Sequence, residues 1–146
     1  MIWFELRREN LAFLGRAPVV HVAEADVAAS RPAVFAALTE PGCWKHWFPS
    51  LREADFGGTR WIEEMIAWDE PARWAWSVTR ASVPLATAQV ESFELTETSD
   101  GTHVRWTLAL EPRLLGRVSG PLAARTIPRL FRRAMDNLGT YVHGAR

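Results

Sequence analysis

The 146-residue sequence contains one cysteine, Cys43, and one lysine, Lys45, and its unbroken apolar runs are only a few residues long. A single cysteine excludes an internal disulfide and a metal site built from several cysteines. The short apolar runs exclude a membrane-spanning helix, which needs about 20 consecutive apolar residues. The formal net charge is zero. The chain therefore lacks the broad positive field on which phosphate binding depends, and we expect no nucleic-acid partner.

Motifs for phosphate and metal binding are also missing. Gly57-Gly58 fits a tight turn, so no glycine-rich phosphate loop follows a predicted strand. The histidines show none of the spacings by which one element offers two ligands to a metal, and they are His21, His46, His103 and His143. We therefore expect neither a metal nor a cofactor. Arg7, Arg8 and Glu9 occupy the place where a signal peptide has its apolar core, which predicts a cytoplasmic protein.

Tryptophan and charge are the features that stand out. Residues 50–100 carry ten acidic and four basic side chains, whereas residues 111–146 carry seven arginines and two acids. In a neutral domain the basic end fits a solvated helix face better than a phosphate-binding patch. Each indole can bury about 150–250 Å², so the tryptophans suit either a core or the wall of a pocket for a flat, apolar ligand. The eight are Trp3, Trp44, Trp47, Trp61, Trp68, Trp74, Trp76 and Trp106.

The apolar pattern predicts one domain over residues 1–146, with residues 1–17 as an arm that lies against its body. Alternation predicts strands over residues 19–29, 51–56, 59–69, 73–82, 86–98 and 102–110. Ser30 is expected to cap a helix that ends at Pro41, and a second short helix is expected over residues 43–48. Asp100-Gly101 predicts a hairpin turn. Steps of three and four predict an amphipathic helix over residues 121–143, with Pro128 inside it or at its start.

Four segments resemble the SRPBCC (START-like, helix-grip) superfamily, and within it the polyketide cyclase/dehydratase-like proteins. They are AEADVAASRPAVFAALTEP (23–41), WKHWFP (44–49), EEMIAWDEPARWAWSV (63–78) and SDGTHVRWTLALEP (99–112). The resemblance covers nearly all of the chain after residue 18. It implies an α+β helix-grip fold, in which a curved antiparallel sheet of six or seven strands wraps around a long C-terminal helix, with two short helices after the first strand. Such proteins usually have seven strands, and the pattern here predicts six.

The resemblance also implies that ligands bind in a cavity between the sheet and the long helix. From the alternation, the expected lining is Trp44, Ile62, Glu64, Ile66, Trp68, Trp76, Val78, Arg80, Phe93, Trp106, Leu108, Phe131, Met135 and Leu138. A carboxyl in an apolar wall has a raised pKa and suits acid–base chemistry, so Glu64 is the first catalytic candidate. The alternative is that Glu63 faces inward, or neither acid does, and that Glu64 is solvated.

Two further polar residues are candidates near that cavity. Arg80 shares a face with Trp76 and is expected either to pair with Glu64 or to lie in water at the end of its strand. His46 is expected near the cavity mouth, where it is the second catalytic candidate because its imidazole titrates near neutral pH. The alternative for His46 is an exposed histidine between two packed tryptophans.

Three functions fit these observations. The first is binding of a small hydrophobic or aromatic ligand in the cavity. The second is a cyclase/dehydratase-type enzyme that folds a polyketone chain and moves protons with Glu64 and His46. The third is a protein–protein regulatory module of the cochaperone or toxin type, which docks a partner through the sheet or through the arginines of the last helix. Fold alone does not choose between them, and whether the chain is an enzyme stays open.

Overall fold

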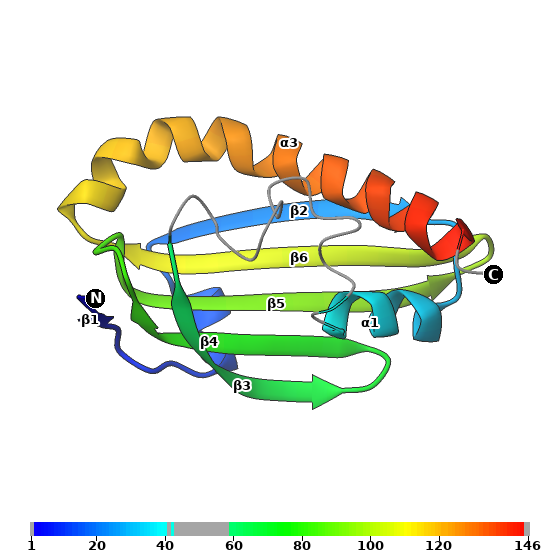
Figure 1. The fold of residues 1–146 in the computed structure, drawn as a ribbon, viewed down its shortest axis with the longest axis horizontal. Helices are drawn as coiled ribbons and strands as arrows, with labels where there is room; N and C mark the ends of the chain where they lie inside the picture. Colours follow the sequence, from blue (N-terminus) through cyan, green and yellow to red (C-terminus); the bar gives the residue numbers. More distant parts are fainter. Residues whose placement is uncertain (1, 41, 43–58, 145–146) are drawn as a thin grey trace.

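The computed structural model describes residues 2–40, 42 and 59–144, which form a six-stranded antiparallel sheet crossed by a long helix (Figure 1). In chain order the elements are β1 (Phe4–Glu5), η1 (Leu11–Gly15), β2 (Val19–Val27), α1 (Arg31–Thr39), β3 (Trp61–Asp69), β4 (Arg73–Ala81), β5 (Ala86–Thr98), β6 (Gly101–Pro112) and α3 (Leu114–Gly144). The strand order is β1-β4-β5-β6-β2, and β3 also pairs with β4. This is the predicted α+β helix-grip fold. The predicted helix over 43–48 and strand over 51–56 lie outside the described residues.

Both described α-helices pack on the same face of the sheet, which we call the inner face. Phe35 and Leu38 of α1 share one buried cluster with Phe131 and Leu138 of α3 and with the indole of Trp74. Helix α3 runs along the sheet above β2 and β6 (Figure 1). The apolar stripe predicted for the last helix is therefore the one that meets the sheet.

Helix α3 begins at Leu114, seven residues before the predicted start, and both Pro121 and Pro128 lie inside it. Its first turn follows directly from β6, because the backbone N–H of Arg117 donates to the carbonyl of Arg113 at 2.9 Å. The early turns escaped prediction because two of their apolar side chains, Leu114 and Val118, are largely exposed and add nothing to the buried stripe.

The N-terminal arm packs on the opposite face, which we call the outer face. Phe13 of η1 is buried there against Ala88, Val90 and Ala109 of β5 and β6. The side-chain oxygen of Asn10 accepts a hydrogen bond from the backbone N–H of Ala12 at 3.0 Å and so caps η1. Through Phe13 the N-terminal segment thus packs on the sheet.

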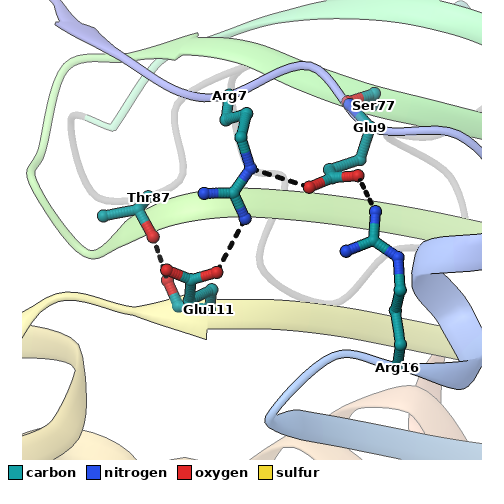
Figure 2. Close-up of polar contacts among 6 residues, drawn as sticks. All are labelled: Arg7, Glu9, Arg16, Ser77, Thr87 and Glu111. Atoms are coloured by element: carbon teal, nitrogen blue, oxygen red, sulfur yellow. Dashed lines mark hydrogen bonds and ion pairs between the residues drawn. The ribbon is translucent and has the colours of Figure 1, made fainter.

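The arm also fills the place where β4 and β5 separate. Strand β1 pairs with the end of β4, after which Leu6 N–H donates to Thr79 and Arg7 N–H donates to Thr87 of β5. The buried carboxylate of Glu9 binds the guanidinium groups of both Arg7 and Arg16 (Figure 2). These contacts fasten the arm to the sheet by charge as well as by the burial of Phe13.

The β5–β6 hairpin lies at the predicted turn, and its glycine is required by space. Gly101 has φ +156°, and a Cβ there would lie 2.2 Å from the carbonyl oxygen of Val27 in β2. Thr98 pairs with Gly101 across the turn. The turn therefore lies tightly against the end of β2. Strand β2 pairs with β6 and forms one edge of the sheet.

Candidate functional site

The pairing of the strands aligns one residue from each of five strands in a row across the inner face. Trp76 of β4 lies opposite Met65 of β3 and Glu91 of β5, and Glu91 lies opposite Leu108 of β6. Leu108 in turn lies opposite His21 of β2. Because opposed residues of antiparallel strands point to the same side, this row crosses the inner face from edge to edge. It contains one acid, Glu91, among apolar and aromatic neighbours.

A stack of aromatic rings fills the neighbouring part of the inner face. The rings of Trp74 and Trp76 have centroids 4.5 Å apart, and Trp74 stacks on Phe93 at 5.8 Å. Trp106 lies parallel to Phe131 of α3 at 5.3 Å. Such pairs contribute about 0.5–1.5 kcal/mol beyond the area they bury. This part is packed core, and Glu91 lies beside it, opposite Trp76.

Glu91 is held by two side-chain hydrogen bonds. The amide of Gln89 donates to Oε1 at 2.9 Å, and the indole N–H of Trp106 donates to Oε2 at 3.1 Å. Burial, together with the negative charge of Glu63, raises the pKa of Glu91 to about 7, although both hydrogen bonds oppose the rise. The carboxyl therefore exchanges its proton near neutral pH, which suits both ligand orientation and proton transfer.

Glu63 is the second acid of this site. Burial raises its pKa, and the nearby indole of Trp76 opposes that rise. The residue nevertheless keeps a large accessible surface. Within the described part of the chain, neither Glu63 nor Glu91 forms an ion pair with an arginine or histidine.

The prediction that Glu64 faces inward is wrong, and the alternative with Glu63 inward holds. Glu64 lies opposite Ser77, whose hydroxyl accepts a hydrogen bond from the arm on the outer face. Its carboxylate forms an exposed ion pair with Arg8 at 2.5 Å. The cause is a β-bulge between Met65 and Ala67, which adds one residue to β3 and reverses the alternation.

The same bulge moves Ile66 from the predicted lining to the outer face, where it packs on the cluster around Phe13. Trp68, beyond the bulge, stays on the helix side and meets Phe35 edge-on at 5.3 Å, with half of its surface exposed. Ile62 is also exposed, close to the end of β3. Of the four lining residues predicted on β3, only Trp68 thus packs against the inner-face core.

Arg80 does not pair with Glu64. Its guanidinium binds Glu5 of β1 at 2.8 Å and is half exposed, so the prediction of a pair with Glu64 is wrong and a strand-end position in water is closer to the structure. Trp44 and His46 lie outside the described residues. The remaining predicted lining residues are buried or half-buried on the inner face, namely Trp76, Val78, Phe93, Trp106, Leu108, Phe131, Met135 and Leu138. Their role in binding stays a prediction.

Sequence reasoning missed Glu91 and Gln89, although the signal was available. Both share the alternation of Phe93 along β5, and Phe93 was placed on the inner face. His21 lies on the same face and is half-buried, and burial lowers its pKa. A count of polar residues on inward positions of every strand, rather than of β3 alone, would have found the acid.

Two surface depressions are lined by described residues, and each has a volume of about 460 Å³. The first lies between the end of β2 and the last turns of α3, beside Val27 and His143. The second lies at the β3–β4 turn, beside Arg73 and Glu94. Neither is lined by the indoles or by the two acids of the inner face, so neither is the predicted cavity.

The chain resembles a known protein family over most of its length. The family described as polyketide cyclase / dehydrase and lipid transport matches residues 52–143, which is more than half of the chain. The chain belongs to this family. Its fold is accordingly the helix-grip fold of polyketide cyclase-like proteins. No curated protein matches the chain significantly.

Solved structures show the same fold as this polyketide cyclase-like chain. A START superfamily protein from Mycobacterium smegmatis is similar with a TM-score of 0.66 at 14% identity, covering 87% of this chain and 99% of that one. A Mesorhizobium loti protein gives 0.62 at 22% identity, covering 82% and 96%. A Bacillus cereus protein gives 0.68 at 14% identity, covering 85% and 95%. At these identities the likeness establishes the fold.

The described residues contain neither a membrane-spanning helix nor a cluster of metal-ligating side chains. None of the helices in residues 2–40, 42 and 59–144 combines the length and apolarity that a membrane crossing needs. Within the same residues, no group of three or more histidine, cysteine, aspartate or glutamate side chains is placed to hold a metal ion.

Proposed function

We propose that the protein binds a small hydrophobic or aromatic molecule on the inner face, between the sheet and α3. The observation that carries this proposal is Glu91, a partly accessible acid set among indoles and aliphatic side chains. A protein selected only for stability gains more from an apolar residue at such a position. A few placed polar groups in an apolar wall are what ligand sites typically contain.

A pair of matched variants tests where the ligand binds. Met65→Trp adds an indole beside Trp76 on the inner face, whereas Glu64→Trp adds the same side chain one residue away on the outer face. Both positions are partly exposed, so both variants are expected to fold. We expect calorimetric titration with flat aromatic alcohols to show at least tenfold weaker binding to Met65→Trp and unchanged binding to Glu64→Trp. Equal effects of both variants, or no binding to the wild type by aromatic or fatty-acyl probes, would contradict the proposal.

Proton transfer is a second candidate function, favoured by the pKa of Glu91 near 7. In a dehydration, this carboxylate would take the proton from a carbon beside a carbonyl, and the resulting acid would then protonate the departing hydroxyl as water. Glu91→Gln is expected to abolish turnover of a β-hydroxy ketone while its affinity stays within about twofold. Loss of affinity together with turnover, or loss of neither, would remove Glu91 from such a mechanism.

A further inference from the structure

Among the residues that the structure describes, the two acids of the inner face have no positive partner. Glu91 receives hydrogen bonds from Gln89 and Trp106, which are uncharged donors. Glu63 lies opposite Val78 and Glu91 lies opposite Trp76, so the two carboxyls flank β4 on the same face of the sheet, and the negative charge of Glu63 raises the pKa of Glu91. A carboxylate has room for about four hydrogen bonds. Both groups therefore keep unused acceptor capacity on a surface that solvent still reaches.

An unused donor lies beside them. The indole N–H of Trp76 is buried, with 6% of the residue exposed, and makes no hydrogen bond of normal geometry. It is nevertheless near enough to Glu63 to lower the pKa of that carboxyl. Buried polar groups in folded proteins are almost always paired. This donor shares the inner face with two acids that have spare acceptor capacity, so another molecule bound there would complete the hydrogen bonds of all three.

The indoles and the two carboxyls of the inner face favour a positively charged molecule. Indole faces attract cations, and two neighbouring carboxyls do so more strongly. An anionic ligand would meet repulsion from both acids, and a purely apolar one would leave them desolvated without compensation. A flat molecule with a protonated nitrogen satisfies the carboxyls and also packs on the aromatic side chains.

We propose that the ligand of the inner face carries a basic nitrogen, held as a cation by Glu63 and Glu91 while its aromatic part packs beside Trp76. This inference rests on the proposed function, because it names the chemical class of the molecule bound there. The site thus recognises aromatic amines in preference to neutral or anionic molecules of the same shape.

Two other charged or titratable residues of the sheet, His21 and Arg80, do not replace the cation. His21 of β2 is separated from Glu91 by Leu108, which places the two strands roughly 10 Å apart. Arg80 of β4 is bound to Glu5 at the end of its strand. Toward the sheet, α3 presents Phe131 beside Trp106, and α1 presents Phe35 beside Trp68. The described helices therefore bring aromatic rings to this face.

Three probes of one shape and different charge test the inference. They are 2-naphthylmethylamine, 2-naphthylmethanol and 2-naphthoate, titrated calorimetrically into the wild-type protein at pH 8 and pH 6. At pH 8 we expect the amine to bind at least tenfold more tightly than the alcohol, and the anion to bind most weakly. At pH 6 the preference for the amine should shrink severalfold, since more of Glu91 is protonated while the amine keeps its charge.

Variants assign the effect to the two acids. Glu63→Gln and Glu91→Gln should each reduce the preference for the amine over the alcohol to about threefold or less, and circular dichroism with urea unfolding checks that each variant folds. Glu64→Gln, on the outer face, should leave the preference unchanged. Equal wild-type affinities for amine and alcohol would overturn the inference and leave the proposed function standing. If none of the probes binds, the proposed function fails, and the inference fails with it.

Discussion

Replacing Glu91 by glutamine should change how the stability of the protein depends on pH. The pKa of Glu91 is about 7 in the folded protein, against an ordinary value of 4.5. Between these values the folded state holds a proton that the unfolded state has released, so the free energy of unfolding falls as pH rises. At about 1.4 kcal/mol for each unit of pKa, the loss reaches roughly 3 kcal/mol by pH 8, an upper bound for a group that solvent partly reaches. Glutamine cannot ionise and removes this loss.

Urea unfolding of the wild type and of Glu91→Gln at pH 5 and pH 8 measures the effect. Glutamine keeps one oxygen for the donors of Gln89 and Trp106, so we expect a cost of about 1 kcal/mol at pH 5. At pH 8 the variant should be the more stable protein by about 1–2 kcal/mol. Glu64→Gln, which loses only an exposed ion pair with Arg8, should follow the wild type within about 0.5 kcal/mol. Parallel pH profiles for the wild type and Glu91→Gln would refute the reasoning.

Three further predictions concern the frame that holds the site. Phe13→Ala should destabilise the protein by about 3–5 kcal/mol in urea unfolding, and a loss below about 1 kcal/mol would show that the arm is not part of the fold. Gly101→Ala should cost more than about 1 kcal/mol because its Cβ meets the backbone of β2, whereas an unchanged melting temperature would contradict that contact. Removing Arg7 and Arg16 together should lower the urea midpoint, because it leaves the buried carboxylate of Glu9 unpaired. Glu9→Gln should lower it less, since both arginines are half exposed, and the reverse order would be inconsistent with this ion-pair network.

Much of the sheet was predictable because its strands alternate in the ordinary way. Strands β4 and β6 each have an apolar face toward the helices and a more polar face on the other side. The ends of β4, β5 and β6 lie within two residues of the predicted ones. The start of α3 was not predictable in this way. Leu114 and Val118 are largely exposed, so they give the buried apolar pattern no sign of the first turns.

The candidate site was predictable only in part, and the reason is local. A β-bulge after Met65 shifts the alternation of β3, and no residue type in WIEEMIAWD marks its position. Alternation counted back from Trp68 therefore assigns Glu64 to the wrong face. The ion pair of Arg80 with Glu5 was equally hidden, because it depends on an arm that returns to the sheet from the start of the chain.

The most direct test of ligand binding on the inner face is the NMR spectrum of the indole N–H groups. The signals of Trp76 and Trp106 are assigned by Trp→Phe variants and followed while 2-naphthylmethanol is added. The account predicts saturable shifts at both, since Trp106 donates to Glu91 and Trp76 lies beside the same site. Shifts confined to the exposed Trp3 and Trp68, with Trp76 and Trp106 unmoved, would contradict it.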